Sequence, residues 1–181
     1  PRTTKQTISI NIVNDDLYEP NIESFTLTLN NPLNGFAVLG ANSSENYEIE
    51  DTDPLPRITL KDISFNEYDA EFIIEAELTN GIGHANGIVV KCETQDGEAL
   101  SPHDYEANNN IRFVWEDEDT ALVQKAPIEI EDDDYEEPAQ TFSVTNCSVD
   151  TDADIEDGSA TITINDDPND IATLSIVDAV N

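Results

Sequence analysis

The stretch IEIEDDDYEEPAQTFSVTN, residues 128–146, joins a dense run of carboxylates to an alternating strand pattern. Six of the seven residues in the run Glu131–Glu137 are acidic. Directly afterwards, Phe142 and Val144 alternate with polar residues, which is the period-2 pattern of a half-buried β-strand. A similar order of residues occurs in INIVNDDLYEPNIESFTLTL, residues 10–29. An acidic turn that leads into a strand is therefore repeated in this chain.

A second pair of segments supports the repeat. YEIEDTDP (47–54) resembles ITINDDPND (162–170), and a new strand pattern follows each of them. A repeat of roughly 116 residues is too long for the short coils of a solenoid and indicates consecutive domains. Proline in both connecting segments predicts short, stiff linkers. We predict residues 1–53 as the second half (the last three strands) of one domain, 54–56 as a linker, 57–168 as a complete domain, and 169–181 as the first strand of a following domain.

Strand patterns extend over the whole chain. EFIIEAEL (71–78) alternates in the same way, and no stretch keeps the 3.6-residue period of an amphipathic helix. Turn residues recur at intervals of about ten residues, as they do in β-sandwiches. The sequence therefore predicts an all-β fold built from antiparallel β-sandwich domains.

The charge of the chain limits its partners. There are 40 Asp and Glu residues against 7 Lys and Arg residues, so the formal net charge is −33. Nucleic-acid binding is not expected, because it needs clusters of Lys and Arg. Membrane insertion is not expected either, because no run of about 18 apolar residues is present. Cations or a basic protein surface are the natural partners, although the charge can also serve solubility alone.

Two further features bear on the origin of the chain. It begins at Pro1 and contains no Met, so we interpret it as a mature piece or fragment of a longer protein. Cys92 and Cys147 both fall in predicted strands. A single cross-strand disulfide and two buried thiols are both compatible with this placement.

Four segments of the predicted complete domain, in their order and spacing, resemble the Calx-beta domain. They are VVKCETQDGEALSPHDY (89–105), IRFVWEDEDT (111–120), IEIEDDDYEE (128–137) and ITINDD (162–167). Calx-beta domains occur in the regulatory loops of sodium/calcium exchangers and in many extracellular adhesion and matrix proteins. The resemblance implies a seven-stranded Greek-key, immunoglobulin-like antiparallel sandwich. Its strands are predicted at 57–65 (A), 70–79 (B), 87–94 (C), 110–115 (D), 122–131 (E), 140–147 (F) and 159–165 (G).

If successive strands alternate in direction, the AB, CD and EF loops and the exit from strand G lie at one end of the sandwich. Carboxylates remote in sequence then share one surface, where each pair at about 4 Å repels by roughly 1 kcal/mol even in bulk water. Ca²⁺ offsets this repulsion, takes about 6–8 oxygen ligands and tolerates irregular geometry. Zn²⁺ prefers Cys or His, and His84 and His103 lie apart from the acidic loops. Ca²⁺ is therefore the expected cofactor.

The resemblance also implies a set of calcium ligands. In the complete domain these are Glu67, Asp96, Asp132, Asp133, Glu136, Asp166 and Asp167, with Asp134 as a further candidate in the EF loop. In the half domain the matching positions are Asp15, Asp16, Glu19, Asp51 and Asp53. Gln140 stands where a second acidic residue is common in the family, whereas the first copy keeps Glu23. The alternative is that these are solvated acidic loops that bind no cation.

We expect a calcium-binding tandem segment of a large extracellular or cell-surface protein with a structural or adhesive role, in which Ca²⁺ stiffens domain ends and junctions. Its partners would be neighbouring Calx-beta domains in the same or an adjacent chain. One alternative is a subunit of an extracellular filament that is completed by strands of neighbouring chains. Another is a cytoplasmic calcium-sensing regulatory domain of an ion exchanger. Catalysis is not expected, because Ser, His and Asp in SPHDY (101–105) are loop neighbours and not a triad from separate elements.

Overall fold

Every regular element in the described part of the chain is a β-strand. The structure is a computed structural model that describes residues 5–30, 32, 37–117, 119–171 and 173–175. We call residues 1–53 the first unit and residues 57–168 the complete domain. The first unit contains β1 (Glu23–Thr28) and β2 (Ser44–Ile49). The complete domain contains β3 (Arg57–Leu60), β4 (Ile63–Asn66), β5 (Ile73–Asn80), β6 (Ile88–Gln95), β7 (Ile111–Trp115), β8 (Val123–Pro127), β9 (Gln140–Val149), β10 (Asp154–Asp157) and β11 (Ala160–Asn165).

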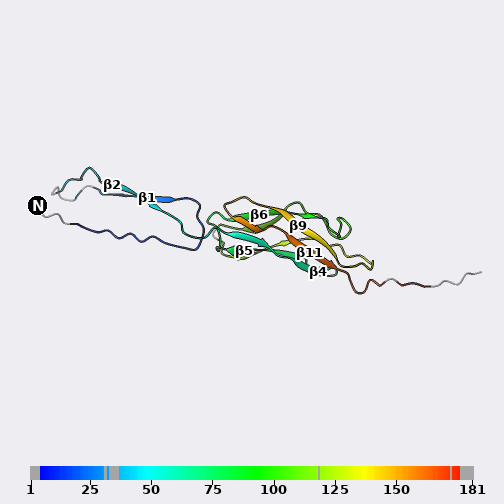
Figure 1. The fold of residues 1–181 in the computed structure, drawn as a ribbon. Helices are drawn as coiled ribbons and strands as arrows, with labels where there is room; N and C mark the ends of the chain where they lie inside the picture. The colour runs from blue at the N-terminus through cyan, green and yellow to red at the C-terminus, as the bar shows by residue number, and fades with distance from the viewer. Residues whose placement is uncertain (1–4, 31, 33–36, 118, 172, 176–181) are drawn as a thin grey trace, which may run out of the picture.

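Two sheets form the complete domain (Figure 1). Their strand orders are β10-β3-β5-β8 and β4-β11-β9-β6-β7. One buried cluster takes residues from both sheets, among them Ile74 of β5, Phe113 of β7 and Phe142 of β9. Along each strand the buried positions alternate with more exposed ones, as the period-2 pattern requires. The predicted all-β sandwich is confirmed, and the acidic loops connect the strands that form its core.

The first and last strands of the complete domain each pass from one sheet to the other. Predicted strand A is divided into β3 and β4, and predicted strand G is preceded by β10. β10 pairs with β3 and β11 pairs with β4, and both pairs are parallel. At the crossing, Asp62 Oδ1 accepts a hydrogen bond from the Thr161 N–H at 2.7 Å. The prediction of one continuous strand A was wrong, because a straight strand can close only one of the two sheets.

Strand directions alternate along the chain as predicted. In one sheet β5 is antiparallel to both β3 and β8, and in the other β9 is antiparallel to both β11 and β6. β3 and β4, the two parts of predicted strand A, lie in different sheets and relate the direction of one sheet to that of the other. Four segments therefore meet at one end of the sandwich. They are the AB loop (67–72), the CD loop (96–110), the EF loop (128–139) and the exit segment (166–171).

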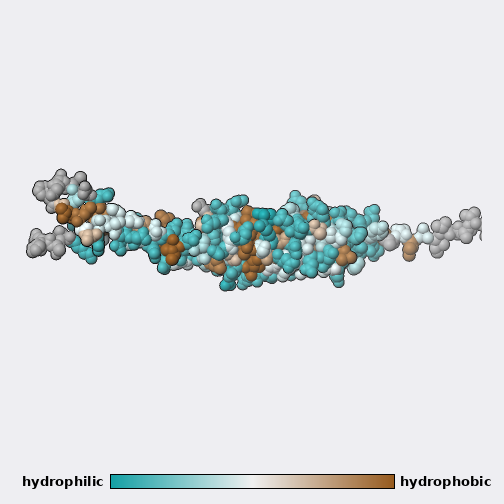
Figure 2. Space-filling view, turned by 90° about the horizontal axis from the view of Figure 1, so that it is seen from above, coloured by the Kyte–Doolittle hydropathy of each residue, from teal (hydrophilic) through white to brown (hydrophobic). Residues whose placement is uncertain are grey.

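The first unit keeps an apolar face open to solvent. β1 and β2 pair in an antiparallel hairpin on which Phe25 and Tyr47 stack with ring centroids 5.4 Å apart. In front of them, Ile8, Ile10 and Ile12 are 61%, 47% and 51% exposed. Figure 2 shows apolar residues grouped on the surface of this unit. The described residues before Tyr18 form no strand, so the predicted strand E has no counterpart there.

The structure bears on three further expectations. Cys92 and Cys147 form a disulfide that joins β6 to β9, which decides between a bridge and two thiols. Because the two cysteines are 55 positions apart in the sequence, the constraint that the disulfide puts on the unfolded chain stabilises the fold by about 2–4 kcal/mol. Of the predicted strand at 169–181, residues 172 and 176–181 lie outside the described part and the others form no strand. No helix among the described residues is long and apolar enough to cross a membrane.

Candidate metal centre

Three segments bring carboxylates together at the end of the sandwich: the AB loop, the EF loop and the exit segment. β4 and β11 are parallel and in register, so Glu67 and Asp166 leave them side by side. The Glu67 N–H donates to the Asn165 carbonyl oxygen at 3.0 Å and fixes this arrangement. Two triads of carboxylates result, and the ligand oxygens within each triad lie within 4.8 Å of one another. They are Glu67 and Asp166 with Asp170, and Asp132 and Asp167 with Asp170.

Glu67 is the buried carboxylate of the centre, with 8% of its surface exposed. Its Oε1 accepts a hydrogen bond from the Asp167 N–H at 2.6 Å, which favours the charged form. Burial outweighs this bond and raises the pKa of Glu67 to about 7. The negative charges of Asp166, Asp132 and Asp170 act in the same direction. Without a compensating cation, Glu67 therefore holds a proton for part of the time at neutral pH.

Asp170 is shared by both triads, yet it was not among the predicted ligands. The chain turns back at Pro168, and the Asp170 N–H donates to the Asp167 carbonyl oxygen at 3.0 Å. This turn buries Asp170 Oδ2, which has no hydrogen-bond partner among the described residues. Burial raises the pKa of Asp170, and the charge of Asp167 adds to the effect. The signal in the sequence was the third Asp of DDPND, which lies beyond the end of strand G.

A small adjoining cavity contains a second group of oxygen atoms. It is lined by Glu67, Asp104, Glu137, Pro138, Gln140, Ile164 and Asp166. The Glu137 N–H donates to Asp166 Oδ1 at 3.1 Å, and Gln140 Nε2 donates to Glu137 Oε2 at 2.9 Å. This leaves Gln140 Oε1 buried without a partner among the described residues. Gln140 thus offers a neutral oxygen where the resemblance led us to expect a carboxylate.

Burial also acts on the acidic residues of this cavity. It raises the pKa of Glu137, and the charges of Asp104, Asp133 and Asp166 raise it further. Asp104, Glu137 and Gln140 were not predicted as ligands. Their approach to Glu67 depends on how the CD and EF loops fold back, which no local pattern in the sequence shows.

Four predicted ligands belong to neither triad of the described residues: Asp96, Asp133, Asp134 and Glu136. Asp96 Oδ1 accepts hydrogen bonds from the Tyr105 hydroxyl at 2.6 Å and the Ser101 N–H at 3.1 Å. The Tyr105 hydroxyl and then the Ser101 N–H lower the pKa of Asp96. Asp96 therefore orders the CD loop from within. Asp133, Asp134 and Glu136 are exposed on the EF loop.

In the first unit, Asp51 organises the acidic residues. Its Oδ2 accepts the Glu19 N–H at 2.8 Å and its Oδ1 accepts the Asp53 N–H at 3.0 Å. Burial alone would raise the pKa of Asp51, but these backbone hydrogen bonds outweigh it and lower the pKa. Burial raises the pKa of Glu19 and Asp53, and neighbouring carboxylates add to both shifts. Asp15 and Asp16 are exposed, and the described residues of this unit contain no triad like those of the complete domain.

Equivalent turns show how the two units correspond. Asp15 Oδ1 accepts the Leu17 N–H at 3.0 Å, and Asp133 Oδ1 accepts the Tyr135 N–H at 2.7 Å. The two turns are 133 − 15 = 118 residues apart. Leu17 therefore occupies the position of Tyr135.

The same spacing relates the hydrogen bonds to the exit of each unit. The Glu19 N–H binds Asp51 as the Glu137 N–H binds Asp166, and 137 − 19 is again 118. Alignment through the two tyrosines instead placed Glu19 opposite Glu136. The structural counterpart of Glu19 is Glu137, which is half-buried, whereas Glu136 is exposed.

The chemistry of the centre is that of a hard cation. Both triads and the adjoining cavity offer carboxylate and amide oxygens and no sulfur or imidazole nitrogen. Oxygen ligands suit Mg²⁺ and Ca²⁺, whereas Zn²⁺ sites use Cys and His. Mg²⁺ requires near-ideal octahedral geometry, but Ca²⁺ accepts about 6–8 oxygens in irregular arrangements. Many oxygens converge here, and two of them are buried without a partner among the described residues, which fits Ca²⁺ better.

Comparisons with known proteins agree with this architecture. The family model of the Calx-beta domain matches residues 1–53 and 54–168. The crystal structure of the apo-form Calx CBD1 domain is similar with a TM-score of 0.52 at 22% identity, over 63% of this chain and 99% of that chain. Calcium binding domain CBD12 of CALX1.1 is similar with a TM-score of 0.51 at 22% identity, over 61% of this chain and 46% of that chain. At these identities the likeness concerns the fold. No curated protein gives a significant match to this chain.

We expect the Glu67 contribution to the stability of the cation-free protein to grow as the pH falls from about 8 to about 6. The pKa of Glu67 is about 7 in the folded state and ordinarily 4.5, so between these values its carboxyl group binds more protons in the folded state than in the unfolded state. This contribution therefore falls as the pH rises, by about 1 kcal/mol over this interval. Urea unfolding in chelator at a series of pH values measures the effect.

The substitution Glu67→Gln should remove this contribution, because the amide does not titrate. Glu71→Gln, an exposed substitution in the same loop, should leave it unchanged. Equal pH dependence of the wild-type protein and Glu67→Gln would contradict the assignment.

Proposed function

Because the chain belongs to the Calx-beta domain family, we propose that its complete domain binds Ca²⁺ between the AB loop, the EF loop and the exit segment. One observation carries the proposal. Asp170 belongs to both carboxylate triads, and its buried Oδ2 has no hydrogen-bond partner among the described residues. A bound cation supplies that partner and compensates the charge of both triads.

Electrostatics favours the bound state. Carboxylates about 4 Å apart repel by roughly 1 kcal/mol in water and more where solvent is excluded. In the cation-free protein burial raises the pKa of Glu67 and Asp170, and the neighbouring carboxylates raise both pKa values further. Ca²⁺ reverses the sign of the interaction, because each carboxylate then faces a divalent positive charge. Binding to the folded state alone also stabilises it by mass action.

The residues have distinct roles in this proposal. Asp132 supplies an exposed carboxylate of the centre, and Glu67 supplies the buried one. The half-buried carboxylates are those of Asp166, Asp167 and Asp170. Gln140 Oε1 offers a neutral oxygen on the adjoining cavity. Since these residues come from the AB loop, the EF loop and the exit segment, one cation joins three parts of the chain. Ca²⁺ thereby stiffens the end of the domain.

We place this domain in an extracellular or cell-surface protein, with a structural or adhesive role. The disulfide between Cys92 and Cys147 supports this placement, because disulfides persist in oxidising compartments and are rare in the cytosol. The same bridge counts against a cytoplasmic calcium-sensing domain of an ion exchanger. Neighbouring Calx-beta domains, in the same or an adjacent chain, are the proposed partners.

The bridge gives a direct test of the compartment. Protein isolated from its natural source with free thiols blocked should yield one peptide pair that joins Cys92 to Cys147 and separates on reduction. Mass spectrometry before and after reduction measures this. Recovery of both cysteines in the blocked, unbridged form would support the cytoplasmic alternative.

Ca²⁺ should raise the melting temperature, and chelator should lower it again. With free Ca²⁺ at about 100 times the dissociation constant, the gain is about 2.7 kcal/mol. Asp170→Asn should abolish most of this shift, because both triads lose a charged ligand. Thermal unfolding in excess Ca²⁺ and in chelator measures the difference.

Two matched variants serve as controls. Glu71→Gln changes an exposed acidic residue of the AB loop outside both triads. Asp96→Asn changes a residue whose Oδ1 is engaged by Tyr105 and Ser101. Both should keep the shift, and a wild-type protein that is indifferent to Ca²⁺ would refute the proposal.

The apolar face of the first unit favours one extension, a filament in which a neighbouring chain covers that face. Phe25 belongs to this face, and its counterpart Phe142 is 1% exposed in the complete domain.

If a neighbouring chain covers this face, the purified protein should associate as its concentration rises, and Ile10→Asp should prevent this association. Val38→Asp adds the same charge outside the face and should not. Sedimentation equilibrium measures the mass, and a monomer at all concentrations would exclude the extension.

A further inference from the structure

The first unit contacts the complete domain through the loop that joins β5 to β6, residues 81–87, which we call the BC loop. The Tyr18 N–H donates to the Gly83 carbonyl oxygen at 3.3 Å, and the Ala85 N–H donates to the Tyr18 carbonyl oxygen at 3.1 Å. These two bonds form a parallel bridge centred on Tyr18 and His84. Beside the bridge, Leu17 is buried although the turn that carries it is exposed. A short piece of β-structure therefore joins the two units.

The BC loop is shaped for this contact. A Cβ atom on Gly83 would lie 2.5 Å from the Asp119 carbonyl oxygen and 3.0 Å from Leu17 Cδ2. Only glycine allows the loop to approach both neighbours at once. A side chain at position 83 would force the Asp119 backbone or Leu17 to move.

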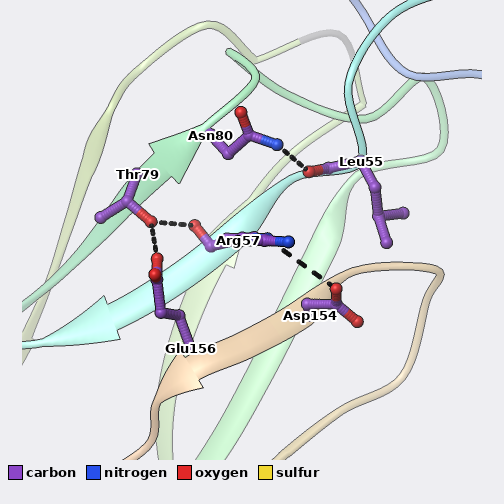
Figure 3. A network of polar contacts seen from close by, with 6 residues as sticks. All are labelled: Leu55, Arg57, Thr79, Asn80, Asp154 and Glu156. Carbon is purple, nitrogen blue, oxygen red and sulfur yellow. Dashed lines mark hydrogen bonds and ion pairs between the residues drawn. The ribbon is translucent and has the colours of Figure 1, made fainter.

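Asn80, at the end of β5, and Gly81, at the start of the BC loop, also contact the linker. Asn80 Nδ2 donates to the Leu55 carbonyl oxygen at 2.9 Å (Figure 3). Gly81 has a φ of 71°, and a Cβ atom there would lie 2.8 Å from the Pro54 carbonyl oxygen. On the other side of the linker, the Asp154 N–H donates to the Pro56 carbonyl oxygen at 2.9 Å. Residues 80–85 therefore contact both connections between the two units. One connection is the linker, and the other is the segment around Tyr18 of the first unit.

His84 is one of these contacting residues and is 2% exposed. Its Nδ1 accepts the Asn86 N–H at 2.9 Å, so Nδ1 carries no proton and the ring proton resides on Nε2. Nε2 is buried and has no partner among the described residues. A second proton on Nδ1 would remove the acceptor of the Asn86 N–H and leave a charge in a buried site. Protonation therefore costs free energy in the conformation in which Gly83 and Ala85 meet Tyr18.

The groups that face His84 come from the first unit and from the segment that follows β9. The Tyr18 ring lies 5.5 Å away between centroids, and Pro20 of the first unit lines the same groove. Asp150 and Asp152, which follow β9, are the carboxylates among the residues that line this groove. Burial lowers the pKa of His84, and the charge of Asp152 opposes this without reversing it. The docked arrangement therefore favours the neutral ring.

We propose that the neutral His84 ring keeps the first unit docked on the complete domain, and that protonation of the ring releases the first unit. The docked state binds fewer protons than the released state, in which the imidazole regains its ordinary pKa of 6.5. Docking is therefore strong above this pH and weakens as the pH falls below it. Each pH unit below 6.5 weakens docking by up to about tenfold until the pKa of the docked ring is reached. This docking through His84 needs no cation and is independent of the calcium centre.

The test measures hydrogen exchange in chelator at pH 7.5 and pH 5.5, corrected for the intrinsic pH dependence of exchange. The protection of the Ala85 amide, which binds Tyr18, should fall by up to about tenfold at the lower pH. Small-angle scattering should show a broader distribution of distances between the units at pH 5.5 than at pH 7.5. His103→Asn removes the exposed histidine and should behave as the wild-type protein does.

Two variants of the joint make the test decisive. His84→Asn places an uncharged acceptor near the Asn86 N–H, so its Ala85 protection should not change between the two pH values. Leu17→Asp should give low protection and a released joint at both pH values without any change at His84. Equal loss of protection at pH 5.5 in the wild-type protein and His84→Asn would overturn the proposal, as would unchanged protection in the wild-type protein.

Discussion

The parallel pairing of β4 with β11 is the contact on which the rest of the structure depends. It joins strands that are about a hundred residues apart and ends with Asn66 opposite Asn165. Because the pair ends in register, the next residues of both strands, Glu67 and Asp166, leave the sandwich together. The Asp167 N–H then reaches Glu67, and the turn at Pro168 brings Asp170 back over both. The carboxylate triads are thus a direct result of how the sandwich is closed.

Much of the fold follows from local patterns in the sequence. Alternation of apolar and polar residues located most strands of the complete domain, because one face of each strand must enter the core. Alternating strand directions then predicted that the AB, CD and EF loops and the exit segment share one end, as they do. The sheet crossing at Asp62 was not predictable in the same way. It depends on a hydrogen bond to Thr161, a partner that only the assembled sandwich provides.

The site was predictable in its location and less so in its members. Glu67, Asp132, Asp166 and Asp167 lie in the triads, because they directly follow strand ends or open a loop. Asp96 was assigned from the resemblance, but its carboxylate serves Tyr105 within its own loop. Asp170 and Glu137 were missed because their positions depend on backbone turns. Alignment of the acidic runs could not place Glu137, since a one-residue difference before Phe25 shifts the correspondence from 117 to 118.

The parallel closure of the sandwich also has a mechanical consequence. The chain enters the complete domain at the start of β3 and leaves it at the end of β11, and these two points lie at opposite ends of the sandwich (Figure 1). Tension applied along the chain therefore pulls the paired first and last strands past each other, in shear. In this geometry the hydrogen bonds of the pair carry the load together and do not open one by one. A string of such domains would resist stretching at the place where Glu67 holds the exit segment.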